Sequence, residues 1–111
     1  MTWNSAQNLV PSAEVKADSI SAFSGDLVGT RVSLAVNVTV PPRSGTPMRI
    51  MVQESHDGST WGVEKMAHQF TRVDAAGVYT ATVDLKAPHN RVAIKPLMFK
   101  ATFSVDGAID S

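Results

Sequence analysis

Residues 31–40 alternate strictly between apolar side chains and polar or small ones. Every second residue from Val32 to Val40 is valine or leucine. Because successive side chains of a β-strand point to opposite faces of a sheet, this pattern predicts a strand with one buried face. The next residues, 41–47, include three prolines, which donate no N–H to a sheet. A loop is therefore expected directly after this strand.

Shorter alternating segments follow along the chain, separated by residues that favour turns. The expected strands cover 48–53, 61–65 and 69–73 (two short strands or one bent strand), 79–85, 92–94 and 97–105. Residues 55–59 predict a tight turn, because Gly58 tolerates positive φ and short polar side chains bond to nearby backbone. Pro96 is expected to interrupt or bulge the chain between the last two strands, and a short polar tail to follow Gly107.

The spacing of these segments indicates the fold class. Strands that recur at intervals of roughly 8–12 residues, without helical periodicity, are typical of antiparallel β proteins. We therefore predict an all-β fold, either an antiparallel β-sandwich of jelly-roll-like form or a small barrel.

Residues 1–29 differ from the rest of the chain, because they contain Pro11, many small polar residues and few apolar ones. We expect them to form an extended N-terminal arm or an edge strand in front of a sandwich domain at 30–111. As an arm, the segment would add an edge strand to the domain, lie on a neighbouring subunit, or become ordered on a partner. The alternative is an ordinary first strand near residues 17–23 behind a frayed terminus.

Composition narrows the possible functions. The 111 residues fit one domain, and ten basic against ten acidic side chains give no net charge, so no nucleic-acid partner is expected. The absence of cysteine excludes disulfides, Cys-bound zinc and thiol nucleophiles. The amino terminus lacks the pattern of a signal peptide and no apolar run is long enough to cross a bilayer, so we expect a soluble product of the cytoplasm with no membrane partner.

No group of residues predicts a catalytic or metal site. Ser55, His56 and Asp57 are the residue types of a serine-hydrolase triad, but a triad needs side chains that converge from separate elements. His56, His68 and His89 lack the spacing of metal ligands, and the glycines form no phosphate-binding motif. We therefore expect that the protein is not an enzyme and binds no metal or cofactor.

Trp61 is a candidate for stacking on a ligand, because it directly follows the predicted turn. Together with Tyr79 and Phe99 it would form an aromatic platform for a sugar. A tryptophan in this position more often closes one end of a sandwich core, and we favour core packing for Trp61.

Several segments of the sequence resemble small structural proteins of tailed bacteriophages. These are MRIMVQESHDGSTW at 48–61, FTRV at 70–73, AGVY at 76–79 and NRVAI at 90–94, with QNLVPS at 7–12 near the amino terminus. The resemblance spans most of the chain, and its motifs are signatures of turns and strands. The proline-containing loop at 41–47 and the later Lys95-Pro96 pair depart from the pattern.

The resemblance implies a decoration or cement protein on the exterior of the capsid. Such proteins carry no catalytic residues, bind across junctions between major capsid protein subunits, and are often dimers or trimers. We therefore expect the major capsid protein and a second copy of the chain as partners. The alternatives are a carbohydrate-binding or host-adhesion module and a small tail or neck protein.

The contacts with a capsid are expected from the arm and from the loop that contains the prolines. The candidate residues are Trp3, Leu9, Val10 and Pro11 in the arm, and Pro41, Pro42, Arg43 and Pro47 in the loop. Prolines in a docking loop lower the entropy lost on binding. Deletion of residues 1–15 is expected to leave a folded core that no longer decorates capsids.

Overall fold

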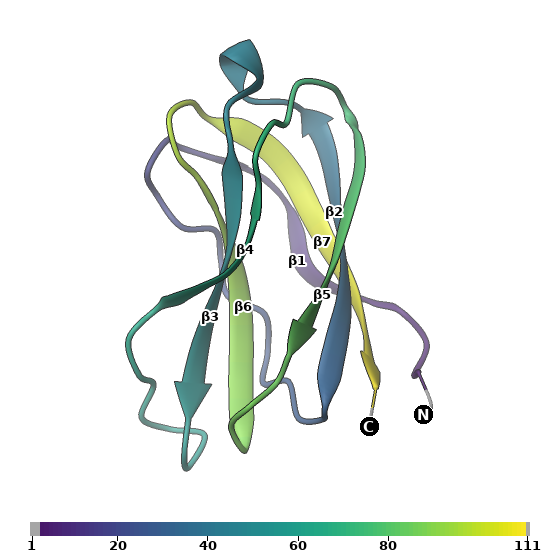
Figure 1. Ribbon diagram of the computed structural model, residues 1–111, viewed down its shortest axis with the longest axis vertical. Helices are drawn as coiled ribbons and strands as arrows, with labels where there is room; N and C mark the ends of the chain where they lie inside the picture. The colour runs from purple at the N-terminus through teal and green to yellow at the C-terminus, as the bar shows by residue number, and fades with distance from the viewer. Residues whose placement is uncertain (1–2, 111) are drawn as a thin grey trace.

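The computed structural model describes residues 3–110, which form two antiparallel β-sheets packed face to face (Figure 1). The elements are β1 (Gln7–Val15), β2 (Arg31–Val40), the 3-10 turn η1 (Arg43–Gly45), β3 (Met48–Ser55), β4 (Lys65–Phe70), β5 (Gly77–Asp84), β6 (His89–Pro96) and β7 (Ala101–Asp110). One sheet has the order β1-β7-β2-β5 and the other β4-β3-β6. The sheets do not close into a barrel, so the predicted all-β sandwich is confirmed and the barrel alternative is wrong.

The alternating residues 31–40 form β2, which lies inside the larger sheet between β7 and β5. Its apolar residues from Val32 to Val38 point inward and are at most 1% exposed. They pack against buried side chains of the smaller sheet, such as Ile50 and Ile94, which are fully buried. Burial of this apolar surface between the two layers is what stabilises a sandwich.

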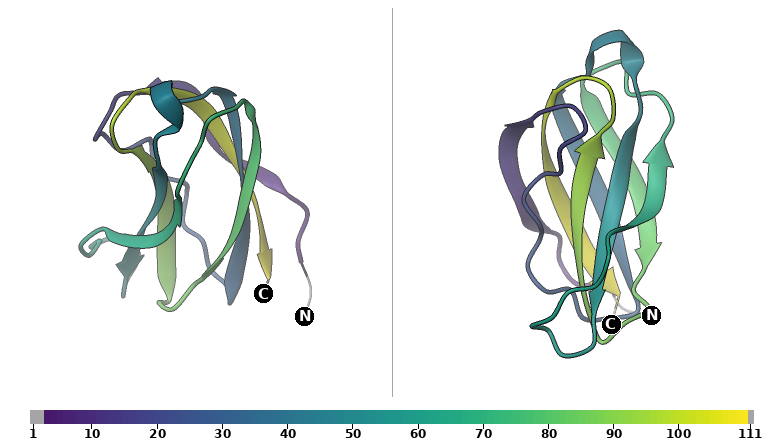
Figure 2. Two further views of the ribbon diagram at one scale, coloured as in Figure 1. Left: turned by 45° about the horizontal axis from the view of Figure 1, so that its top comes forward. Right: turned by 90° about the vertical axis from the view of Figure 1, so that its left-hand side faces the viewer.

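Residues 18–27 run beside β6 and cover its edge, as the dark blue chain in Figure 2 shows. Backbone N–H groups at every third residue of the segment donate to β6 carbonyls: Asp18 to Pro96, Ser21 to Ile94, Ser24 to Val92 and Leu27 to Asn90. The Ser21 and Ser24 hydroxyls accept hydrogen bonds from the backbone N–H groups of Ile94 and Val92, at 2.9 and 3.0 Å. Serine side chains thus take the place of the backbone carbonyls that a regular strand would offer.

With this segment included, the strand pairing is that of a jelly roll. Counted along the chain, there are eight extended segments, and they pair from the two ends inward. The pairs are β1 with β7, 18–27 with β6, β2 with β5, and β3 with β4. This is a long hairpin wrapped around a core, the arrangement of double-sheet jelly rolls. The jelly-roll-like form expected from the sequence therefore describes the chain path.

The amino-terminal residues belong to the sandwich. Residues 7–15 form the edge strand β1, which pairs with β7, so of the two forms expected for this region these residues take the edge strand. The alternative first strand near residues 17–23 is wrong, because this stretch bonds to β6 only at every third residue and forms no regular ladder.

Several strand boundaries differ from the prediction, and β6 extends over residues 89–96 where only 92–94 were expected. The segments 61–65 and 69–73 yield one strand, β4, at 65–70, and Trp61 makes only an isolated bridge with Ser55. Residues 97–100 form a loop, and β7 begins at Ala101. Gly107 lies inside β7, which continues to Asp110 in place of a polar tail because residues 107–110 pair with β2. A Cβ at Gly107 would lie 2.5 Å from the Leu9 side chain, so glycine fits there.

Within residues 3–110, no helix has the length and apolar character that crossing a membrane requires.

Candidate functional site

The candidate contact residues lie at opposite ends of the sandwich. Trp3 forms a bridge with Asp110 at the end where β2 begins, and the Arg31 guanidinium lies 5.3 Å from the centre of its ring. The loop at 41–47 follows the other end of β2, at the top of Figure 1. We call the Trp3 end the base and the loop end the apex. The two groups of candidates therefore do not form one surface.

Two of the candidates are not available to a partner in this structure. Val10 is 2% exposed and Pro42 is also buried, because both side chains point into the domain. Leu9 is half-buried and packs against the core, whereas Pro11 is exposed on the edge strand. In the loop, Arg43 is exposed, and Pro41 and Pro47 are half-buried.

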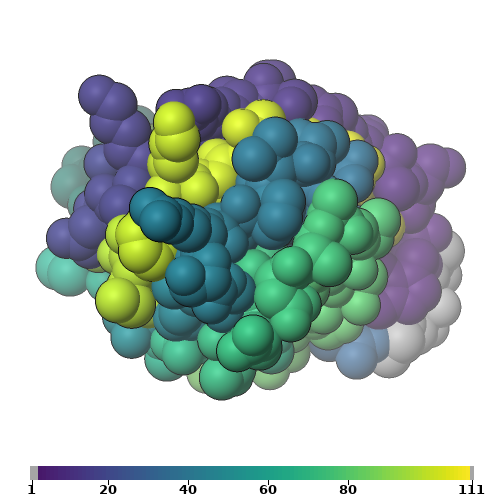
Figure 3. All heavy atoms as spheres, turned by 90° about the horizontal axis from the view of Figure 1, so that it is seen from above, coloured from purple at the N-terminus to yellow at the C-terminus, as the bar shows by residue number. Residues whose placement is uncertain are grey.

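Three loops meet at the apex, and with Val40 at the end of β2 they form what we call the apical platform, residues 40–47, 71–74 and 97–100 (Figure 3). The backbone N–H of Val73 donates to the carbonyl of Thr46, and that of Leu97 donates to the carbonyl of Pro47, both at 3.3 Å. The loop after β2 is therefore tied to both of the other loops. Val73 is fully buried, which anchors the second loop in the core.

Close packing at Gly45 adds to the order of the apical platform. Gly45 has a φ of 61°, and a Cβ at this position would lie 2.8 Å from the Cβ of Asp74. Asp74 in turn accepts a hydrogen bond from the Nε of Arg72 at 2.9 Å. Only glycine combines this backbone conformation with so close a neighbour.

The surface of the apical platform combines apolar and cationic side chains. Val40 is 56% exposed and Met98 is 63% exposed. The Arg43 guanidinium lies 6.0 Å from the centre of the Phe99 ring, within the range of a cation–π contact. The sequence pointed to Arg43, and to Phe99 only as a ring beside Trp61, and it did not point to Met98, since residues 97–100 fitted the alternation of a strand. Pro96 directly before them is the signal that favoured a loop.

Trp61 belongs to a second surface, on the outer face of the smaller sheet. The Arg91 guanidinium lies between two aromatic rings, 4.4 Å from the centre of Trp61 and 4.3 Å from that of Phe23. Its Nε donates to the Gln53 side chain at 2.8 Å, and Gln53 donates to the carbonyl of Gly62 at 3.0 Å. Trp61 is half-buried in this stack and lies outside the core cluster, so the expected core packing is wrong.

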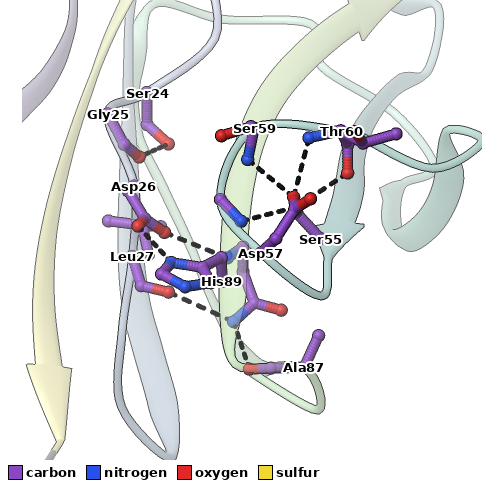
Figure 4. A network of polar contacts seen from close by, with 12 residues as sticks. Ser24, Gly25, Asp26, Leu27, Ser55, Asp57, Ser59, Thr60, Ala87 and His89 are labelled. Atoms are coloured by element: carbon purple, nitrogen blue, oxygen red, sulfur yellow. Dashed lines mark hydrogen bonds and ion pairs between the residues drawn. The ribbon is translucent and has the colours of Figure 1, made fainter.

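The turn after β3 is held by its own polar side chains (Figure 4). The Asp57 carboxylate accepts hydrogen bonds from the backbone N–H groups of Ser59 and Thr60, both at 2.8 Å. Both hydrogen bonds lower the pKa of the Asp57 carboxyl because they stabilise its charged form, and the bond from Thr60 has the larger effect. The Ser55 hydroxyl donates to the carbonyl of Thr60 at 2.7 Å and accepts from the N–H of Gly58 at 2.9 Å.

A serine, a histidine and an aspartate do meet near this turn. His89 lies opposite Ser55 across the β3–β6 ladder, and its Nδ1 is 2.5 Å from a carboxylate oxygen of Asp26. The Ser55 hydroxyl, however, is engaged within the turn, and the residue is only 3% exposed. A nucleophilic serine needs a hydroxyl that faces both its base and the substrate. Ser55 therefore has a structural role in the turn.

Two shallow depressions, each of a little over 300 Å³, lie along the open sides of the sandwich. The first, of about 320 Å³, is bordered by β1 and residues 25–27 and includes Asn8 and Asp26. The second, of about 310 Å³, lies between β4 and β5 and mixes both charges, with Glu54 and Lys65 paired at 2.6 Å. Among residues 3–110, no three metal-ligating side chains group together.

A comparison of the sequence with models of known protein families, and with curated proteins, finds no match.

Proposed function

We propose that this protein is a structural component of a tailed-bacteriophage particle, a capsid decoration protein that docks on the major capsid protein through its apical platform. The observation that carries the proposal is the preformed apical platform itself. Its three loops are joined by backbone hydrogen bonds and expose both apolar and cationic side chains. The motifs at 48–61 and 90–94 resemble phage structural proteins, and this resemblance is the reason for proposing a capsid protein as the partner.

A preformed surface suits repeated weak binding. Loops that are already ordered lose little entropy on docking, so more of the contact energy appears as affinity. On an icosahedral shell the same contact repeats at every equivalent site, so the stabilising effects of the bound copies add over the whole particle. The proposed role is structural, on the capsid exterior, and requires no catalytic step or cofactor.

The experiment is a co-sedimentation of the purified protein with expanded, genome-free capsids of the phage that encodes it, followed by electron microscopy. We expect regular added density at junctions between capsid subunits. Met98→Asp and Arg43→Glu alter the apical platform and are expected to weaken binding about ten-fold or more, because each places a mismatched charge in the contact. The matched control is Val28→Asp, at a base residue that is 59% exposed.

Equal binding by the apex variants and the base variant would overturn the role of the apical platform. Added density at the neck or tail would show that the protein binds there and not to the capsid. Binding to glycans that is lost in Trp61→Ala would favour an adhesion module, the second candidate. The observation that favours this candidate is the half-buried Trp61 stacked on Arg91 at 4.4 Å.

A further inference from the structure

Three of the four edges of the two sheets carry features that protect an edge strand from pairing. Residues 18–27 cover β6. The edge strand β1 contains Pro11 and Glu14 and shifts its register twice against β7. The edge strand β4 contains Lys65 and one register shift against β3. Proline, charge and bulges are the devices by which natural sheets keep edges from pairing with other chains.

The fourth edge, β5, has only one of these devices, the charge of Asp84 at its end. It pairs with β2 over its eight residues without a shift in register. From Gly77 to Val83 it contains no charged residue and no proline, and Val78 is 62% exposed. Among residues 3–110, no strand bonds to its outer side. A regular, uncharged and partly apolar edge of this kind is suited to accept a further strand.

We propose that β5 pairs with β5 of a second copy of this chain, antiparallel about a two-fold axis, and joins two four-stranded sheets into one continuous sheet. The midpoint of the uncharged stretch is Thr80, and pairing centred there sets Thr80 opposite Thr80 of the partner subunit. Val78 then faces Thr82 of the partner subunit, and Tyr79 faces Ala81 of the partner subunit. β-Branched and aromatic cross-strand pairs of this kind stabilise a sheet.

The charge distribution favours a second copy as the occupant. Asp84 is the only charged residue of β5 and lies at its end, so pairing centred at Thr80 brings no like charges opposite each other. The register must also keep outward residues opposite outward ones, because a slip of one residue would reverse the faces. An antiparallel pair centred on a residue satisfies this condition. The inference is independent of the capsid role proposed above.

Single cysteines report this register directly, because the chain contains no cysteine of its own. Cα atoms opposite each other in an antiparallel pair are about 4.5–5.5 Å apart, which a disulfide can span. We expect Thr80→Cys to form a disulfide-linked dimer under mild oxidation. Ser12→Cys on β1 and Ala67→Cys on β4 are matched controls at exposed edge residues and are expected to stay largely uncrosslinked.

Sedimentation velocity measures the association without a crosslink. We expect the native chain to form dimers, and Thr80→Lys to weaken dimerisation by roughly ten-fold or more, because two ammonium groups would lie opposite each other. Thr80→Val keeps the shape of the side chain and is expected to remain dimeric, as is Ser12→Lys on the β1 edge. Circular dichroism verifies that each variant is folded.

A native chain that stays monomeric at its highest soluble concentration would overturn the proposal. So would a dimer that persists in Thr80→Lys, or one that crosslinks through Ser12→Cys or Ala67→Cys in preference to Thr80→Cys. A larger assembly that depends on Thr80 but crosslinks elsewhere would equally contradict two-fold pairing of β5.

Discussion

Asp57 shows how one side chain holds a turn. Its carboxylate accepts hydrogen bonds from the backbone N–H groups of Thr60 and Ser59, and these bonds lower its pKa in the folded protein. In the unfolded chain an aspartate titrates at about pH 3.9. Since the folded pKa is the lower one, Asp57 stabilises the fold above that pH, and the contribution is lost as the pH falls through the folded pKa.

We therefore expect Asp57→Asn to flatten the acid dependence of stability. The amide keeps an oxygen that accepts the same hydrogen bonds but cannot titrate. Urea unfolding of the native chain and of the variant, at pH 5 and at successively lower pH, gives the two slopes. The free energy of unfolding of the native chain is expected to fall more steeply below about pH 4. Identical slopes would show that the Asp57 charge does not contribute.

At this scale the sequence predicted local partners and missed distant ones. The turn at 55–59 followed from Gly58 and the short polar side chains beside it, which bond to backbone within a few residues. The stack of Trp61 on Arg91 joins residues that are far apart in the sequence, and no local sequence pattern predicts such a pair. For the same reason Val10 and Pro42 were expected to be accessible although both are buried.

Among the elements, the segment at 18–27 depends most on individual side chains. Ser21 and Ser24 are 6% and 5% exposed, and their hydroxyls satisfy backbone N–H groups of β6. We expect Ser21→Ala and Ser24→Ala each to lower the free energy of unfolding by about 1–3 kcal/mol, the cost of leaving a buried N–H without an acceptor. Chemical denaturation measures this loss.

Exposed serines on other elements provide the comparison. Ser12→Ala on β1 removes an exposed hydroxyl and is expected to change the free energy of unfolding by less than about 0.5 kcal/mol. Losses at Ser21 and Ser24 no larger than this would indicate that water replaces the hydroxyls at the β6 edge.

Strands in which apolar and polar side chains alternate were predictable from the sequence. The segment at 18–27, which bonds to β6 at every third residue, was not. β2 was located at its observed bounds because apolar side chains alternate throughout it. Residues 18–27 bond to β6 at every third residue, which matches neither a strand nor a helix period. β7 was misplaced because its start was masked by the apolar residues Leu97 and Phe99, and its end by Gly107.

For the whole molecule, the position of β1 changes the expected result of a truncation. The sequence suggested that residues 1–15 are separable, but β1 contributes Val10 and Val15 to the core and pairs with β7. Each buried valine contributes roughly 1.5–3 kcal/mol, a large part of the stability of a small domain. We expect deletion of residues 1–15 to lower the melting temperature strongly or to unfold the chain.

The matched control is deletion of residues 1–6, which leaves β1 intact and is expected to cost far less. Thermal melting followed by circular dichroism distinguishes the two truncations. Equal melting temperatures for the longer truncation and the full chain would show that β1 is dispensable. Contacts of this region with a capsid are therefore better tested by point substitutions, such as Pro11→Ala, than by deletion.

The two proposals together have a consequence for the geometry of a dimer. Antiparallel pairing through β5 turns the two apical platforms in opposite directions, about one molecule length apart, and the longest extent of one copy is 38 Å. Because the two platforms face away from each other, they could not both rest on one flat capsid surface, and a dimer would reach two capsid features only if these stand at its two ends. The jelly-roll pairing itself could be inferred only in outline from the sequence, because it depends on which distant strands meet.

The bridge between Trp3 and Asp110 brings both ends of the described chain together at the base, away from the apical platform (Figure 1). A peptide antigen, an enzyme or a fluorescent protein fused to either end would thus leave the domain at the end opposite the apical platform. The same closeness makes the chain suited to circular permutation, in which a short linker joins the old ends and new ones open in an exposed loop.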